Sequence, residues 1–173
     1  MPSTYTTNTG VEKPASGEQS GSWGNTVNTN MDIVDRALNG VVSISLSGTT
    51  STLSTGNGTL TNGQNAVLLL TGSLSAAHTI TVDPSDANKV YLVKNDAGDT
   101  VTFSQGSGST TANVVNGTFG IVFANGNNQC VNLMDNPGIT SLILGGTAVT
   151  STAAELNTLD GVNPSLEAAD LNL

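Results

Sequence analysis

The chain has 173 residues, of which threonine, asparagine, serine and glycine make up nearly half. Only 10% of the residues are charged, and the 13 acidic against 4 basic residues give a formal net charge of −9. Such an acidic chain repels phosphate backbones, so no nucleic acid is expected as a partner. The longest apolar run, residues 66–70, has the length of a strand. A membrane-spanning helix needs roughly 18 apolar residues, so no membrane insertion is expected.

The same composition indicates the fold class. Threonine and valine fit the pleated surface of a sheet, while glycine and asparagine supply the turns between short strands, so a mainly β protein is predicted. The single cysteine, Cys130, excludes an intramolecular disulfide. Residues 1–5 lack the basic start of a secretory signal, so synthesis in a reducing cytoplasm is expected.

Residues 1–22 contain two of the five prolines and almost no apolar periodicity. This predicts an extended arm that becomes ordered only on a partner surface. From Trp23 to Asn39 a helical pattern follows, which ends before Gly40. Its apolar residues recur at steps of four, three and four residues and lie on one stripe: Val27, Met31, Val34 and Leu38.

A helix of about four turns is marginal in isolation, so this stripe must pack against another surface. In one interpretation the helix packs against the β-domain of its own chain. In the other, the stripe is a seam shared by three identical chains around a threefold axis, which the strict four-three-four spacing favours. The length of the stripe does not decide between the two.

Residues 41–135 are expected to form the β-domain. Residues 41–46 alternate between two faces of a strand, and turn-forming pairs such as Asn62-Gly63 separate the apolar runs that follow. Turn signals recur at roughly 8 to 12 residues, which predicts an antiparallel β-sandwich or jelly roll. The expected strands are residues 41–46, 51–54, 66–71, 78–82, 89–95, 100–105, 118–124 and 129–134.

Residues 136–173 are expected to be a linker followed by the start of short helical, shaft-like repeats. Residues 139–144 form one more strand-like run, and the motif AAELN at residues 153–157 recurs as AADLN at residues 168–172. The second copy stops at Leu173, before an Asp-Gly turn of its own. The native chain is therefore expected to continue further.

Several segments carry a resemblance to a known family. Residues 17–24 (GEQSGSWG), residues 28–30 (NTN) and residues 33–40 (IVDRALNG) resemble the N-terminal part of tail-fibre and related virion proteins of tailed bacteriophages. The resemblance is closest to phages of marine bacteria and cyanobacteria. Residues 83–89 (DPSDANK) are similar to a linker phrase of the same proteins, and residues 152–162 (TAAELNTLDGV) are similar to a repeat of phage fibre shafts.

The resemblance implies a homotrimer that is made in the host cytoplasm and located in the virion tail. Its N-terminal part would attach to the tail adaptor, nozzle or baseplate, and its distal part would reach the host surface. The attachment residues that it implies are Trp23, Glu18 and Gln19. Trp23 has two interpretations, as a hydrophobic staple of its own helix or as an anchor in a groove of the virion partner.

Two alternatives to a tail fibre are compatible with the sequence. A capsid decoration or head-fibre protein would use the arm to bind the capsid protein. A glycan-binding module would need aromatic faces, and the expected β-domain offers four such residues: Tyr91, Phe103, Phe119 and Phe123. All four fall inside apolar runs and are expected to belong to the core, which weakens the glycan-binding interpretation.

No enzymatic activity, cofactor or metal site is expected. The only histidine, His78, lies at the start of an expected strand, and no pattern marks a catalytic triad, so it is interpreted as a strand-edge residue. The carboxylate pairs at residues 83/86 and 96/99 lie in turns and do not fit an EF-hand. They are interpreted as caps of their own backbone.

Overall fold

The computed structural model describes residues 2–107, 110–135, 142–144 and 147–149. The described chain is mainly β, and it divides into the units Met1–Pro137 and Gly138–Leu173. In the second unit, strands β12 (Leu142–Leu144) and β13 (Thr147–Val149) pair antiparallel. The helical repeats expected after residue 150 lie outside the described residues.

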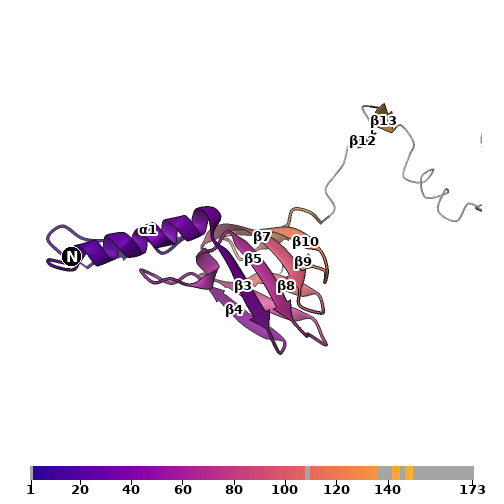
Figure 1. Cartoon of the computed structure of the whole chain (residues 1–173), viewed down its shortest axis with the longest axis horizontal. Helices are drawn as coiled ribbons and strands as arrows, with labels where there is room; N and C mark the ends of the chain where they lie inside the picture. Colours follow the sequence, from indigo (N-terminus) through magenta and orange to yellow (C-terminus); the bar gives the residue numbers. More distant parts are fainter. Residues whose placement is uncertain (1, 108–109, 136–141, 145–146, 150–173) are drawn as a thin grey trace, which may run out of the picture. The chain divides into compact units, whose positions relative to one another are not determined.

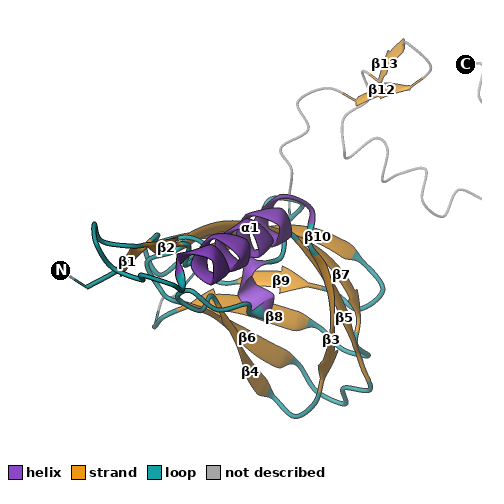
Figure 2. Ribbon diagram, turned by 60° about the vertical axis from the view of Figure 1, so that its left-hand side comes forward, coloured by secondary structure: helices purple, strands orange, loops and turns teal. Residues whose placement is uncertain are grey.

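Two sheets make up the β-domain, and Figures 1 and 2 show them as facing layers. The five-stranded sheet has the order β11-β10-β7-β5-β3, and the four-stranded sheet has the order β4-β6-β8-β9. The first consists of β3 (Val41–Leu46), β5 (Val67–Gly72), β7 (Asn88–Asp96), β10 (Phe119–Asn125) and β11 (Cys130–Asn132). The second consists of β4 (Thr50–Ser54), β6 (His78–Asp83), β8 (Val101–Gln105) and β9 (Ala112–Val114).

From β3 to β8 the chain passes from one sheet to the other at every connection. Strands β3, β5 and β7 therefore pair in parallel, as do β4, β6 and β8. Strands β9, β10 and β11 join the sheets antiparallel. The expected antiparallel arrangement is wrong for the pairs among β3 to β8. Turn residues predict that the chain reverses, but not whether the next strand pairs with the previous one or faces it across the core.

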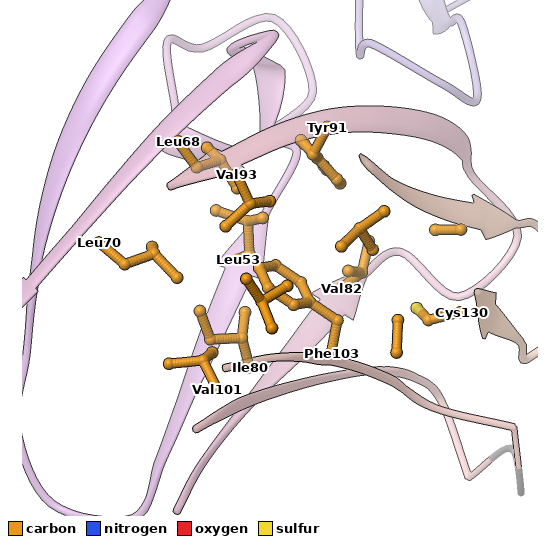
Figure 3. Packing of buried hydrophobic residues seen from close by; sticks show 14 of the residues in the cluster. Leu53, Leu68, Leu70, Ile80, Val82, Tyr91, Val93, Val101, Phe103 and Cys130 are labelled. Carbon is orange, nitrogen blue, oxygen red and sulfur yellow. The ribbon is translucent and has the colours of Figure 1, made fainter. Parts of the chain in front are cut away.

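The hydrophobic core lies between the two sheets, as Figure 3 shows. Successive side chains of a strand point to opposite faces, so alternate residues enter the core. Leu68 and Tyr91 enter it from the five-stranded sheet, and Ile80 and Phe103 enter it from the four-stranded sheet. Full burial of such side chains contributes about 1.5–3 kcal/mol each, which makes this cluster the main source of stability.

The predicted strands are present to within two residues at each end. Strand β9 is not among them, because three residues are too few for alternation to be recognised. The helix α1 (Trp23–Asn39) spans the residues that the apolar periodicity predicts. Figure 1 shows it extending away from one end of the sheets, with the N-terminus near its far end. Within the described ranges, no helix has the length and apolar character of a bilayer-spanning segment.

The C-terminal end of α1 is tied to the β-domain by backbone hydrogen bonds. The Arg36 carbonyl accepts from the N–H of Gly40, which closes the helix, and from the N–H of Ala66, just before β5. The carbonyl of Gly40 accepts from the N–H of Val67. The helix therefore leads directly into β3 while remaining bonded to the start of β5.

Residues 2–22 differ from the expected arm, because a surface of the same chain orders them. Strands β1 (Thr4–Tyr5) and β2 (Glu12–Lys13) form a short antiparallel ladder. The loop between them is buried at Gly10, whose carbonyl accepts a hydrogen bond of 2.8 Å from the N–H of Gly58. The polar composition signals a segment without a core of its own, but it does not reveal that the β-domain supplies the supporting surface.

Candidate assembly site

Most of the apolar stripe predicted on α1 is left exposed by the residues that the structure describes. Leu38, Met31 and Trp23 expose 69%, 63% and 61% of their surface. Val34 is also exposed, and Val27 is half-buried. An exposed row of large apolar side chains on one helix marks an interaction surface rather than ordinary surface variation.

A different face of α1 packs against its own chain. Ile33 is fully buried, and α1 contacts the short helix η1 (Asn62–Gln64). The side-chain amide of Asn30 donates to the Glu12 carbonyl at 2.8 Å, and its oxygen accepts from the Glu12 N–H at 2.9 Å. The helix thus docks on its own chain, as the first interpretation predicts, but not through the predicted stripe. A lone isoleucine among polar residues was the only sequence signal for this docked face.

Trp23 opens α1 and lies beside the stripe. A hydrophobic staple would bury the indole against its own helix, whereas most of the ring is exposed in this chain. Buried tryptophans contribute strongly to protein interfaces. The geometry therefore favours the interpretation of Trp23 as an anchor for a partner.

The other two expected attachment residues lie just before the helix and are held differently. The Glu18 carboxylate accepts hydrogen bonds from the Ser3 hydroxyl at 2.9 Å and from the Ala15 N–H at 3.1 Å. Both bonds lower the pKa of the Glu18 carboxyl, and the bond from Ser3 has the larger effect. The Glu18 side chain is fully exposed. Gln19 adopts a left-handed backbone with φ of 62°. Its amide donates to Glu12, but its buried side-chain oxygen has no hydrogen-bond partner in the described structure.

Gln64 is a buried residue that the sequence patterns did not single out. Its side-chain amide donates to the carbonyls of Thr9, Gly56 and Thr59 at 2.8 to 3.2 Å. Its side-chain oxygen accepts from the N–H of Thr61. One glutamine therefore joins the N-terminal loop to the turn after β4. A glutamine in a turn carries no sequence signal for such a role.

The outward positions of the five-stranded sheet form a second exposed apolar surface. Val41, Val67, Leu92 and Ile121 lie side by side in register across β3, β5, β7 and β10. This surface, called the apolar outer face below, consists of Val41, Val67, Leu69, Val90, Leu92, Phe119, Ile121, Phe123 and Val131. Alternation predicts two faces for each strand, but only the pairing shows that the outward residues form one surface.

A groove of about 350 Å³ lies on the apolar outer face. Its lining includes Val67, Leu69, Leu92, Phe119, Ile121 and Met134. Phe119 is 71% exposed, and Phe123 also lies on the outward face of β10, so the expected place of both in the core is wrong. In β10 the inward positions are taken by Gly120, Val122 and Ala124, which leaves the preceding phenylalanine on the outside. An apolar run does not by itself reveal which of its residues faces inward.

The outer face of the four-stranded sheet has the opposite chemistry. Thr50, Thr79, Thr102 and Asn113 lie side by side in register across β4, β6, β8 and β9. The Thr102 hydroxyl donates to the Asn113 side-chain oxygen at 2.9 Å. Hydroxyl and amide groups can be solvated fully by water, so this face needs no partner.

His78 is the first residue of β6, at the start of a strand as expected, and its side chain is fully buried. Its Nδ1 lies 3.0 Å from the Gly48 carbonyl oxygen, which assigns the proton to Nδ1. Nε2 then accepts from the Ser51 hydroxyl at 2.8 Å. Two members of a catalytic triad are thus adjacent, but a backbone carbonyl stands in the place of the carboxylate. The buried ring joins β4 and β6 to the turn that precedes β4.

Three titratable groups face inward near the core. Burial lowers the pKa of the Lys89 ammonium from 10.5 to about 8, and the group donates to the Gln64 carbonyl at 3.3 Å. Burial raises the pKa of the Cys130 thiol from 9.0 to about 11. It also raises the pKa of Tyr91, whose hydroxyl donates to the Gly63 carbonyl at 3.0 Å. Lys89 and Tyr91 are fixed by backbone acceptors, which is typical of structural positions.

No cluster of three or more metal-binding side chains occurs among the described residues. The Asp99 carboxylate accepts from the N–H of Thr100 at 2.6 Å, and Asp96 pairs with Lys94 at 2.8 Å. The capping role expected for the second carboxylate pair therefore describes Asp99, while Asp96 forms an ion pair instead.

No protein-family model, curated protein or solved structure matches the chain. The exposed stripe of α1 and the apolar outer face are the two features of the described residues that indicate a function.

Proposed function

We propose that the chain is a structural protein of a tailed-bacteriophage virion and forms the virion-proximal part of a homotrimeric tail fibre. The observation that carries the proposal is that α1 has two apolar faces. Ile33 already packs on the chain, and the stripe with Met31 and Leu38 remains exposed. Because four-three-four spacing is the pattern of a coiled-coil seam, the stripe fits the same stripe on other copies. The resemblance of residues 17–40 to phage fibre proteins points to the virion.

The N-terminal segment supplies the attachment site in this proposal. Trp23 is the anchor, since its exposed ring lies at the start of the helix. Gln19 supports the same site, because left-handed backbone costs a non-glycine residue about 1–2 kcal/mol and such strain clusters at functional positions. Its buried side-chain oxygen has no hydrogen-bond partner among the described residues, which adds to the cost of holding Gln19 in this conformation.

The β-domain serves as a shoulder between the attachment site and the shaft. Its two facing sheets act as a rigid sandwich that spaces the trimer, and the repeated motif at residues 153–157 and 168–172 begins the shaft. Neither role needs a catalytic group. The distal shaft then supports adsorption to the host.

Exposed Phe119 is the one observation that favours glycan binding by the β-domain. Sugars stack on open aromatic faces, but the ammonium group of Lys94 lies over this ring at 4.9 Å from its centroid. The neighbouring side chains Leu92 and Ile121 offer no hydrogen bonds to sugar hydroxyls. Assembly therefore explains this surface better than glycan recognition.

Incorporation into virions tests the proposed function. We expect the wild-type chain in the tail fraction of purified virions, detected by mass spectrometry. Trp23→Ala should reduce its amount per virion at least tenfold, because loss of an interface anchor costs about 2 kcal/mol or more of binding. Tyr5→Ala is the matched control, since Tyr5 is another partly exposed aromatic residue of the N-terminal segment.

Absence of the wild-type chain from virions would contradict the proposal. Equal incorporation of Trp23→Ala and Tyr5→Ala would remove Trp23 from the attachment site. Recovery in the capsid fraction instead of the tail would support a decoration or head-fibre protein.

A further inference from the structure

The apolar outer face remains exposed although it lies on a well-packed sheet. Val90 and Leu92 of β7 are about half exposed, and Phe119 of β10 is 71% exposed. On one side of the sheet these strands bury a core, and on the other side they present a groove of about 350 Å³. A sheet that is apolar on both faces is typical of a sheet that is covered on both faces.

This face continues from the exposed stripe of α1. Leu38 belongs to the last turn of the helix, and Val41 is the first residue of β3, on the far side of Gly40. Both are exposed, and only Asn39 and Gly40 separate them in the sequence. Strand β3 is also an edge of the five-stranded sheet, so Val41 lies where the helix stripe meets the sheet surface.

The charges around the face identify the kind of partner. At the described outward positions of the five strands, the only charged side chains are Lys94 and Asp96, which neutralise each other at 2.8 Å. Two copies of a chain with net charge −9 repel each other, so copies can meet only through a neutral surface. An anionic membrane surface would instead require clustered Lys or Arg.

The size of the stripe leads to the same partner. A stable interface takes about 20–30 residues, or about 800 Å², from each partner. The four residues of the stripe and the neighbouring Trp23 are too few for a trimer that withstands dilution. The apolar outer face adds nine further residues, which bring the combined contact closer to the size of a stable interface.

We infer that the apolar outer face binds a second copy of this chain, so that the contact between copies begins on α1 and continues across β3, β5, β7 and β10. The inference rests on the proposed homotrimer, because it names the sheet surface that completes the trimer contact. The cross-strand row Val41, Val67, Leu92 and Ile121 forms the centre of this contact.

A pair of matched substitutions in the full-length chain tests this inference. Leu92→Glu places a charge at the centre of the apolar row, and Thr79→Glu places the same charge at the centre of the hydroxyl row of the other sheet. Sedimentation velocity and native mass spectrometry over a dilution series measure the dissociation constant. We expect Leu92→Glu to raise it at least tenfold or to abolish the oligomer, and Thr79→Glu to leave it unchanged.

A second variant removes any doubt about folding. Val67→Thr combined with Leu92→Thr keeps residues that favour strands and gives the row the chemistry of the opposite face. We expect this variant to keep the circular dichroism of the wild type and to dissociate at least tenfold more readily. Unchanged association of this variant and of Leu92→Glu would overturn the inference.

Met31→Asp separates this inference from the proposed trimer. If Met31→Asp dissociates the oligomer and the sheet variants do not, the trimer stands and the sheet contact is wrong. A wild-type chain that is monomeric at tens of micromolar would contradict both.

Discussion

The outer faces of the two sheets differ although the sheets share one core. The five-stranded sheet presents Val67, Leu92 and Ile121 in one cross-strand row, and the four-stranded sheet presents Thr50, Thr79 and Thr102 in the corresponding place. Both rows lie on twin layers of the same domain, and all strands bury their inward residues. Within the described part of the chain, the shared core therefore does not account for the difference between the two outer faces.

The threonine residues are therefore not spread evenly over the surface of the β-domain. Threonine keeps the β-branched shape that strands favour while offering a hydroxyl to water. Valine shares this shape, but exposed valine and leucine leave apolar area in water. The outer face of the four-stranded sheet therefore suits contact with water. The outer face of the five-stranded sheet exposes apolar area, which suits contact with a protein.

We expect the largest effect on stability from the substitution of a buried phenylalanine, compared with the same substitution of an exposed one. Phe103 is fully buried between the sheets, and Phe119 is 71% exposed on the apolar outer face. Phe103→Ala should lower the free energy of unfolding by about 3–5 kcal/mol at every protein concentration. Phe119→Ala should lower it by less than about 1 kcal/mol in the monomer, where it loses only the contact with Lys94. Urea unfolding followed by circular dichroism measures both.

At concentrations where copies associate, the Phe119→Ala effect should grow, because association stabilises the folded chain by mass action. A Phe119→Ala effect that stays below about 1 kcal/mol at all concentrations would contradict the contribution of this residue to a contact between copies. A large effect in the dilute monomer would mean that Phe119 belongs to the fold rather than to the surface.

A second, smaller effect extends the comparison to the two faces of α1. Ile33 is fully buried, and the adjacent Val34 belongs to the exposed stripe. Ile33→Ala should lower the protection of α1 amides from hydrogen exchange by about 2–4 kcal/mol, because burial of the side chain docks the helix. Val34→Ala changes helix propensity by a similar amount and serves as the control. Equal effects in the monomer would contradict the assignment of a docked face and a free face.

Much of the fold follows from local patterns. The period of the apolar residues places α1 correctly, and alternation with turn signals places most strands. The parallel pairing does not follow, because Gly48 and Asn62-Gly63 reverse the chain equally well in a hairpin or in a connection between sheets. Strand pairing depends on contacts that are distant in sequence, and no local residue encodes them.

The candidate site divides in the same way. The stripe with Met31 and Leu38 is visible in the sequence because a helix converts its spacing into one surface. The apolar outer face is not, because Val41, Val67 and Leu92 come together only through the registers of three strands. The support of the N-terminal loop by Gln64 depends on contacts with residues as far away as Thr9. Surfaces made by one element can be predicted, and those made by several cannot.

The two lysines of β7 lie on opposite faces of the strand, so their charged groups have different surroundings. Lys94 lies on the outer face and pairs with Asp96. Lys89 lies on the inner side, where its ammonium group is 5.6 Å from the centroid of the Tyr91 ring and donates to the Gln64 carbonyl. Burial lowers its pKa from 10.5 to about 8. The inner lysine therefore makes folding dependent on pH.

The sign of this dependence follows from proton binding. Below pH 8, Lys89 is protonated in both states and its burial penalty is constant. Above pH 8 the unfolded chain holds the proton more tightly, so stability should rise with pH up to about 10.5. Cys130 has the opposite effect above pH 9, since its pKa is raised to about 11. The interval from pH 8 to 9 therefore isolates the lysine.

Lys89→Met keeps a flexible apolar side chain at this position and removes the titrating group. Between pH 8 and 9 the wild type should gain about 1 kcal/mol of unfolding free energy relative to Lys89→Met, because a tenfold fall in proton concentration costs the unfolded state up to about 1.4 kcal/mol. Urea unfolding of both proteins at the two pH values measures the difference. Parallel changes in the two proteins would mean that water solvates the Lys89 ammonium in the folded chain. The inner side of β7 would then not exclude water at this position.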